Sequence, residues 1–220
     1  MSETSIIRKP FKYSNFNAVY WLIGINIFVF LLCTEQVMRI FGPGLRYFLL
    51  TRMSMIPILV REGWIWTFVT YMFMHGGFSH ILFNMLGLLI FGIHVERQMG
   101  SREFLLYYLV TGALAGVFSF FVYYFTGSYV VALMGASGAL YAVQLAYAIF
   151  YPNSIIYIWG ILPLRAPVMV LGFTALSIYF VITGGGGNVA HLTHLAGFAF
   201  GWLYFVIRFG VSPWRRLTGR

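Results

Sequence analysis

Residues 134–141 read MGASGALY, and they place Ser137 between Gly135 and Gly138 at the start of an apolar run. A serine hydroxyl at such a turn is a candidate nucleophile if other parts of the chain supply a base and donors for an oxyanion. The same residues also fit simple packing, because small side chains let two helix backbones approach each other closely. The serine alone therefore leaves both interpretations open.

Two further segments carry side chains that could assist a nucleophile. The segment HGGFSHILFN places His80 and Asn84 four residues apart, on one face of a helix. The segment HLTHLAG contains His191 and His194. Each has a second interpretation: the first pair fits an interhelical hydrogen bond, His194 fits a hydrogen bond to a backbone carbonyl, and His191 fits a loop position.

The composition defines the kind of protein that carries these residues. The chain has 220 residues, of which 60% are hydrophobic and 9% charged, and its mean hydropathy of +0.84 excludes an ordinary soluble domain. The basic N-terminal residues precede no small-residue cleavage site, so we expect no removable signal peptide. We attribute the net charge of +9 to membrane topology and expect no nucleic-acid partner. The single cysteine, Cys33, excludes an intrachain disulfide and is expected in the core.

The apolar runs predict an all-α membrane protein with six transmembrane helices and a long, partly helical first loop. The expected spans are Val19–Cys33, Phe78–Val95, Phe104–Phe125, Ser137–Tyr151, Val168–Ile182 and Val189–Phe209. At about 1.5 Å per residue the fourth run is only about 22 Å long, so its start is expected below the membrane surface.

The segments outside the spans complete the predicted organisation. Within the connection 34–77, basic and large apolar residues alternate, as in an element that lies in the bilayer interface. The run GGGG at 184–187 is typical of a flexible loop, and GSYVVALMGAS before Ser137 fits a recessed loop that lines a wet cavity. We divide the chain into a cytoplasmic segment 1–18, a six-span domain 19–209 and a basic cytoplasmic tail 210–220.

The basic residues predict the orientation. With six spans, one side of the membrane holds Arg8, Lys9, Lys12, Arg97, Arg102, Arg165, Arg208, Arg215, Arg216 and Arg220, and the other holds Arg39, Arg46, Arg52 and Arg61. This distribution favours cytoplasmic termini, in a membrane that we expect to be a bacterial plasma membrane. Spans two, four and six then begin at the outer face, which brings His80, Ser137 and His194 to a similar depth. His94 lies fourteen residues beyond His80, about 21 Å deeper, and cannot share their site.

The ionisable residues limit the chemistry that such a site can perform. The five acidic residues are all glutamates, so an aspartyl dyad and a Ser-His-Asp triad are excluded. No histidine is followed by glutamate, and no carboxylate lies at the depth of His191 and His194, so we expect no metal and no cofactor. A dyad remains, with Ser137 as nucleophile and His194 as general base.

Neighbouring residues could complete this dyad. Tyr141 follows Ser137 by one helical turn, so its ring could stack on His194 or be an ordinary core aromatic. The Ser137 backbone N–H at a helix start, together with the His80 and Asn84 side chains, could stabilise an oxyanion.

The spacing of small residues bears on how the two helices meet. Gly197 and Gly201 form a GxxxG pattern, which lets the sixth span approach the fourth near Gly138 and Ala142. We therefore expect Tyr141 and the glycines 135, 138, 197 and 201 to surround the dyad and hold its two residues in position.

Taken together, these residues resemble those of the rhomboid family of intramembrane serine proteases. The similarity is carried by GASG with Ser137, HLAGFAFG with His194, and HGGFSHILFN with His80 and Asn84. WTFVTYMFMH is similar to the end of the family's first loop, GIHVERQMG to its Gly-x-x-x-Glu turn at Gly92 and Glu96, and ILPLRAPV to the connection into span five. The similarity covers Trp64 to Gly201.

The resemblance implies a six-helix bundle whose water-filled cavity opens outward, with Ser137 as nucleophile, His194 as its partner and Tyr141 packed on that histidine. It implies single-span membrane proteins as substrates, which enter between spans two and five, and a mobile cap at Gly184–Gly187. Many family members carry Trp-Arg in the first loop, where this chain has Trp66-Thr67. The anchoring of that loop is therefore left open.

Three hypotheses follow. The leading one is a serine endopeptidase that cleaves transmembrane segments near their outer boundary, with the lipid bilayer as its setting. The second is a catalytically inactive relative that binds membrane clients, which should lack the serine or the histidine. The third is a transporter or channel, which should show inverted repeats or a polar pathway across the whole membrane; neither is visible in the sequence.

Overall fold

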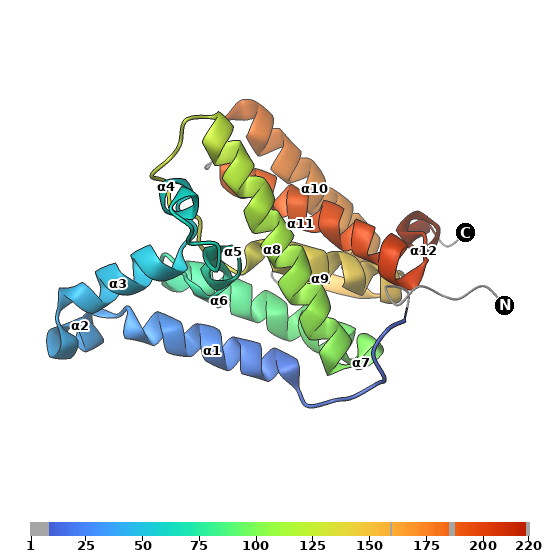
Figure 1. Ribbon diagram of the computed structural model, residues 1–220. Coiled ribbons are helices and arrows are strands. Elements are labelled where there is room, and N and C mark those ends of the chain that lie inside the picture. The colour runs from blue at the N-terminus through green and yellow to red at the C-terminus, as the bar shows by residue number, and fades with distance from the viewer. Residues whose placement is uncertain (1–8, 159, 185–187, 219–220) are drawn as a thin grey trace.

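The computed structural model describes residues 9–158, 160–184 and 188–218, and most of them form a helical bundle (Figure 1). In this part of the chain, four helices are long and apolar enough to cross a membrane: Phe78–Met99, α8 (Ser101–Phe125), α10 (Ala166–Thr183) and His191–Phe209. The first of these is continuous through α6 (Phe78–Gly87), the π-helical turn η3 (Leu88–Gly92) and α7 (Ile93–Met99), and the last combines α11 (Asn188–Tyr204) with the π-helical turn η4 (Phe205–Phe209). These helices confirm the predicted all-α membrane class.

The two remaining predicted spans are shorter. The helix α1 (Ala18–Leu32) reaches a spanning length only together with α2 (Glu35–Phe41), from which it is bent by 59°. The central helix α9 (Ser137–Phe150) has 14 residues and is too short to cross a bilayer unaided. The short fourth helix was expected from the sequence, whereas the count of six spans stays a prediction.

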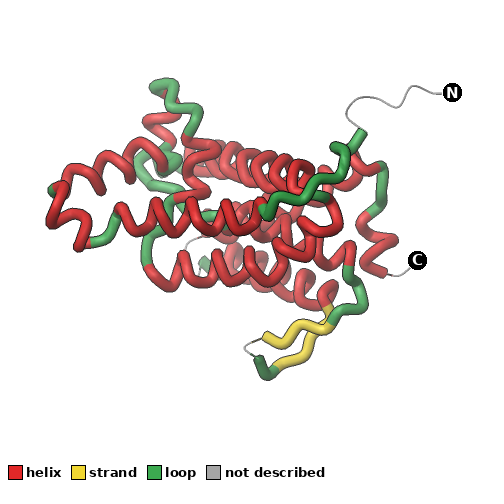
Figure 2. Tube along the Cα trace, turned by 90° about the horizontal axis from the view of Figure 1, so that it is seen from below, coloured by secondary structure: helices red, strands yellow, loops and turns green. Residues whose placement is uncertain are grey.

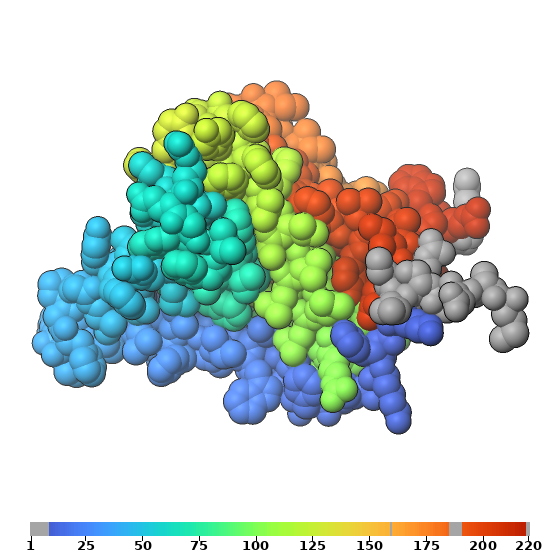
Figure 3. Space-filling model, in the orientation of Figure 1, coloured from blue at the N-terminus to red at the C-terminus, as the bar shows by residue number. Residues whose placement is uncertain are grey.

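The first loop is largely helical, as predicted. It contains α2, α3 (Pro43–Met53), α4 (Pro57–Arg61), α5 (Thr67–Thr70) and the 3₁₀ turn η2 (Tyr71–Phe73). Figure 3 shows α2 and α3 projecting at one end of the molecule, while α4 and α5 lie beside α8 and contact it.

The anchoring of this loop, left open by Thr67, is visible in its contacts. Thr67 is fully buried and donates its hydroxyl to the Trp64 carbonyl at 2.6 Å. The Trp66 indole N–H donates to the Arg52 carbonyl at 2.9 Å, and the Arg52 guanidinium lies 4.1 Å from the centre of the Trp64 ring. Cation–π stacking and backbone hydrogen bonds therefore anchor the loop.

A β-hairpin between α9 and α10 was not predicted. The strands β1 (Ile155–Ile158) and β2 (Leu162–Arg165) pair antiparallel, with Ile155 opposite Arg165. Figure 2 shows the hairpin projecting away from the helices. The β-branched residues of IIYI favour a strand, and Gly160, with φ +71°, permits the turn.

The helix α9 forms the centre of the core, in contact with α8, α10, α11 and η3. Its small residues Ala139, Ala142, Ala146 and Ala148 are fully buried, which lets the neighbouring helices pack close to its backbone. A short helix, α12 (Pro213–Thr218), turns back across the end of α9.

Two buried glutamates tie the opposite end of the bundle together. Glu96 accepts hydrogen bonds from the N–H groups of Ala18 and Val19, at 2.6 and 3.0 Å, and from the Ser101 hydroxyl. Its carboxylate thus lies at the N-terminus of α1, where the helix dipole favours a negative charge. Glu103 accepts from Arg208 at 2.8 and 2.9 Å and from the Tyr204 hydroxyl. We use the name terminal end of the bundle for the part that contains Glu96 and Glu103. It also includes residues 9–17, the β-hairpin and α12.

Candidate active site

The structure brings Ser137 and His194 together, although 57 residues separate them in the chain. The Ser137 Oγ and His194 Nε2 atoms lie 2.9 Å apart, a hydrogen-bond distance. Ser137 is the first residue of α9 and His194 lies in α11. A neutral imidazole with its lone pair on Nε2 could take the serine proton, as a general base must.

Tyr141 supports this histidine from one side. Its ring stacks on the His194 ring with 4.1 Å between centroids and 10° between planes. The Nδ1 atom of His194 is buried and has no hydrogen-bond partner among the described residues. The imidazole is therefore oriented by stacking, in a place where Ser-His-Asp enzymes use a carboxylate.

The close approach of the two helices depends on glycine. A Cβ atom added at Gly197 would lie 2.1 Å from the Gly138 carbonyl oxygen, so no larger residue fits there. One at Gly201 would lie 2.7 Å from the Tyr107 hydroxyl and 3.1 Å from the Ala142 methyl. The backbones of α9 and α11 thus touch below the dyad, where the GxxxG spacing predicts close packing.

The loop before Ser137 is held by the first loop. The Gly135 N–H donates to the Tyr71 carbonyl at 2.9 Å, and Met55 and Leu133 exchange two backbone hydrogen bonds at 2.9 and 3.1 Å. Gly135 has a φ of +118°, a conformation that disfavours residues with side chains. The chain is therefore in a fixed, non-helical conformation where α9 begins, and the Ser137 N–H, as the first of that helix, has no intrahelical partner.

His80 lies directly against this loop. A Cβ atom added at Gly135 would lie 2.6 Å from the His80 Nε2 atom. Asn84, one turn further along α6, donates its side-chain amide to the His80 carbonyl at 2.9 Å, and its Oδ1 atom is buried without a partner. His80 is thus next to the Ser137 turn, whereas the Asn84 amide would have to exchange its present partner to reach an oxyanion.

A cavity of about 360 Å³ opens beside these residues. It is formed by α6, α9 and α10 and is lined by Ser79, His80, Phe83, Asn84, Ser137, Leu140, Tyr141, Gln144 and Phe173. Because Gln144 is seven residues beyond Ser137, the cavity extends about 10 Å below the serine along α9.

Two residues around this cavity were missed in the sequence analysis. Gln144 is 7% exposed, and its Oε1 atom has no partner among the described residues. Gln144 follows Ser137 by seven residues and so lies on the same face of an apolar helix, a spacing that could have predicted its place in the cavity. His75 is 6% exposed, its ring lies 5.0 Å from the His80 ring, and both its nitrogens lack partners. It lies in a loop, so no helical periodicity pointed to it.

Burial and the adjacent His80 lower the pKa of His75 to about 4. The imidazole is therefore neutral at pH 7, because burial disfavours its charged form more than the Phe73 backbone favours it.

The other histidines lie outside the dyad. His191 stacks on Phe180 of α10 with 4.7 Å between centroids, and the centroids of the His191 and His194 rings lie 5.9 Å apart. His94 packs against Tyr147 and Tyr151, near the far end of α9. The proposed cap at Gly184–Gly187 lies, apart from Gly184, outside the described residues.

Comparison with known proteins identifies the family. The family model of the Rhomboid domain matches residues 62–211, about two thirds of the chain. The chain belongs to the rhomboid family. Its apolar helices and this membership make it an integral membrane protein.

Three curated rhomboid proteins illustrate the similarity. The chain is 32% identical over 136 residues to rhomboid protease GlpG of Haemophilus influenzae, covering 61% of this chain and 67% of the relative. It is 31% identical over 199 residues to Rhomboid-like protein 16, chloroplastic, of Arabidopsis thaliana, covering 80% and 59%. It is 29% identical over 157 residues to RHOMBOID-like protein 12, mitochondrial, of the same plant, covering 63% and 45%. The match thus spans about half the length of the two plant relatives, and the family includes named proteases.

Proposed function

We propose that this rhomboid protein is an intramembrane serine endopeptidase that hydrolyses peptide bonds in or near transmembrane segments of other membrane proteins. The observation that carries the proposal is the 2.9 Å contact between the Ser137 hydroxyl and the His194 imidazole, beside a cavity that Ser137 lines. The relationship to a protein named as a rhomboid protease supports it.

In the proposed mechanism, His194 Nε2 takes the Ser137 proton while Oγ attacks the substrate carbonyl. The negative charge that develops on the carbonyl oxygen is stabilised by the Ser137 backbone N–H and by the His80 and Asn84 side chains. The proton then passes from His194 to the leaving amine, and water hydrolyses the acyl-enzyme with His194 as base again. Tyr141 keeps the imidazole ring in position throughout.

The substrate path that we propose runs between α6 and α10. Phe83 of α6 and Phe173 of α10 line the cavity from its two sides. In the most apolar stretch of α10, 22% of the residues are buried, whereas the share is 39% in each of the other three long helices. Fewer packing contacts therefore oppose a displacement of α10. We further propose residues 19–209 as the protease domain, cytoplasmic termini and a bacterial plasma membrane, on the distribution of basic residues.

The test is cleavage of a fluorogenic transmembrane substrate by the full chain reconstituted in liposomes. Wild type should cleave it and Ser137→Ala should not, while Ser128→Ala, a serine in the loop between α8 and α9, should retain activity. Equal cleavage by wild type and Ser137→Ala would refute the proposal. Failure of wild type to cleave, together with no labelling of Ser137 by a fluorophosphonate, would favour the inactive client-binding alternative.

A further inference from the structure

A second cavity lies at the terminal end of the bundle, away from the candidate active site. It has a volume of about 610 Å³ and is lined by Ile149, Phe150, Pro152, Gly210, Val211, Ser212, Arg215 and Arg216. The cavity lies where α9 ends and where Gly210, with φ +64°, turns the chain out of η4 toward α12. We call it the α12 cavity.

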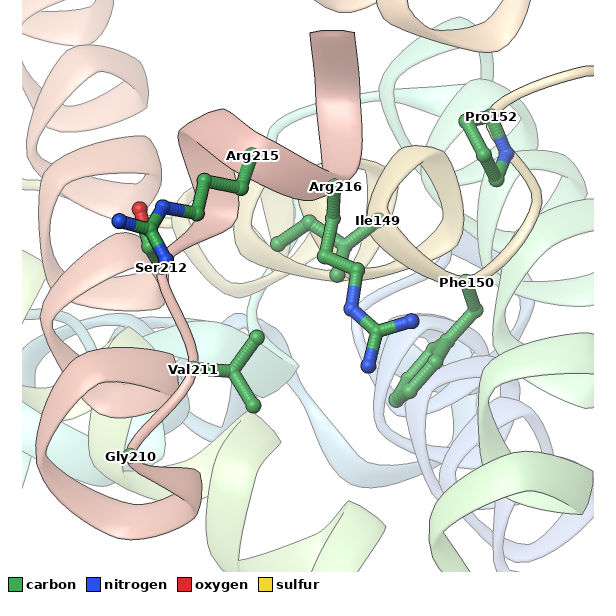
Figure 4. Close-up of a pocket in the computed structure, with 8 residues that line it drawn as sticks. All are labelled: Ile149, Phe150, Pro152, Gly210, Val211, Ser212, Arg215 and Arg216. Carbon is green, nitrogen blue, oxygen red and sulfur yellow. The ribbon is translucent and has the colours of Figure 1, made fainter. Parts of the chain in front are cut away.

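The walls of the α12 cavity combine apolar and cationic groups. Figure 4 shows the Arg216 side chain extending into the space between Val211 and Phe150, while the Arg215 side chain extends toward Ser212 at the rim. Both arginines are exposed. Neither the hydroxyl nor the backbone N–H of Ser212 donates a hydrogen bond to any part of the chain that the structure describes. The cavity therefore offers two guanidinium groups and a hydroxyl above an apolar wall.

Among the described residues, no acidic side chain forms an ion pair with Arg215 or Arg216. The ion pair found among the described residues is Arg208–Glu103, at the same end of the bundle. Glu96 is committed to the N-terminus of α1 and Glu103 to Arg208 and Tyr204. Over the ranges that the structure describes, the terminal end exposes seven basic side chains: Lys9, Lys12, Arg97, Arg102, Arg165, Arg215 and Arg216.

A structural role for Arg215 and Arg216 at the C-terminus of α9 is the simplest alternative. Arginine side chains there could bind the last carbonyls of the helix and interact with its dipole. In the structure, neither guanidinium donates to a carbonyl of α9. The two arginines thus remain available to an external anion.

The surroundings indicate which anion. The α12 cavity lies just beyond η4, where the apolar helix His191–Phe209 ends, so we expect it at the depth of the lipid headgroups. Trp214 is 57% exposed on the same helix, as are many tryptophans at membrane interfaces, while Leu217 packs against the core. Arginines that lack acidic partners near an apolar wall are typical of sites for anionic lipid headgroups.

We propose that the α12 cavity binds the phosphate of an anionic phospholipid, with Arg216 and Arg215 as its ligands and Ser212 as a hydrogen-bond donor. The acyl chains would lie along the apolar surface beside the cavity. Arginine suits this role because its planar guanidinium binds phosphate oxygens in pairs. This site is independent of the proposed protease activity.

The experiment is native mass spectrometry of the full chain taken from membranes that contain phosphatidylglycerol and phosphatidylcholine with the same acyl chains. Wild type should retain phosphatidylglycerol preferentially, and Arg215→Gln/Arg216→Gln should lose that preference by about tenfold or more. The matched control is Arg97→Gln/Arg102→Gln, which removes the same charge from the same end but leaves the cavity intact, and should behave as wild type. If the double variant does not fold, Arg216→Gln alone, exposed and without a hydrogen bond in the structure, replaces it.

Three results would overturn the proposal. Equal retention of the two lipids by wild type would mean that the cavity does not select charge. An equal loss in the Arg97/Arg102 control would assign the effect to the overall charge of the surface. Displacement of the lipid by inorganic phosphate at equal concentration would identify a site for free phosphate.

Discussion

The two ends of the bundle differ in how many of their buried polar atoms lack a partner: at the terminal end, the Ser14 Oγ atom lacks one. At the terminal end, Glu96, Glu103 and Arg208 are joined by hydrogen bonds and an ion pair. Around the candidate active site, five buried polar atoms lack partners, out of nine in the described residues: His75 Nδ1 and Nε2, Asn84 Oδ1, Gln144 Oε1 and His194 Nδ1.

This difference indicates that one end of the bundle contributes mainly to stability and the other mainly to the proposed reaction. A buried polar group with no partner costs free energy, so natural proteins retain such groups mainly where a function requires them. The terminal end holds the helices together, whereas in the proposed function the unpaired donors and acceptors of the site end serve a substrate. Substitutions at the two ends should therefore affect different measurements.

The largest effect is expected at the dyad. His194→Gln removes the proposed base, and kcat should fall by about 10⁴-fold or more. The unfolding temperature should change little, because the glutamine amide is polar, as the imidazole is, and can replace its hydrogen bond with the Ser137 hydroxyl. Cleavage assays and thermal unfolding in detergent measure the two quantities. If His194→Gln instead lost much stability and kept its activity per folded molecule, His194 would have a structural role and not a catalytic one.

The second effect concerns stability at the terminal end. Glu103→Gln leaves the Arg208 guanidinium without its carboxylate, and the free energy of unfolding should fall by about 3 kcal/mol. Activity per folded molecule should change by less than about twofold, since the site lies at the other end. Glu62→Gln, an exposed glutamate in the first loop without an ion pair in the structure, is the control and should be neutral. Denaturant titration followed by tryptophan fluorescence would distinguish the two variants.

The third prediction separates backbone strain from displacement of a donor. Gly135→Ala should lower kcat by about 10²–10³-fold, because the new methyl group meets the His80 ring that we propose as an oxyanion donor. Gly127→Ala is the matched control: it also has a positive φ, of +75°, but a Cβ atom there contacts nothing within 4 Å. It should lose stability and keep kcat. Equal kinetic losses in both variants would assign the effect to strain.

The last prediction concerns the pH dependence of stability. The pKa of His75 is about 4 in the folded protein and 6.5 in a reference peptide, so the unfolded chain binds the proton more readily. Stability should be full above about pH 6.5 and should fall by about 3 kcal/mol as the pH drops toward 4. The groups that share a cavity with His75 include Cys33, Glu35 and Arg46.

Unfolding measured between pH 4 and 7.5 would check this dependence. His75→Phe should make the profile less steep, because other buried histidines remain, whereas His94→Gln, an exposed histidine at the other end, should leave it as in wild type. A profile that is unchanged in His75→Phe would assign the proton to another group.

The helical class and the meeting of Ser137 with His194 could be predicted from the sequence because both depend on short-range patterns. Helix length follows from apolar runs, and the GxxxG spacing indicates which helix faces meet. The partners of Glu96 and the packing of His75 on His80 could not be predicted, since they join loops whose conformations depend on tertiary contacts. The hairpin was not predicted because IIYI is a short apolar run, and in such a run the sequence pattern of a strand cannot be distinguished from that of a buried helix.

The contact between Gly197 and the Gly138 carbonyl fixes the spacing of the dyad by main chain alone. Because the backbones of α9 and α11 are already in contact, no side chains lie between them that could be compressed. When the bilayer becomes thinner or thicker, the outer helices can tilt to match it, while this pair moves as one body. The hydroxyl and the imidazole would therefore keep their separation across lipid compositions that reshape the rest of the bundle.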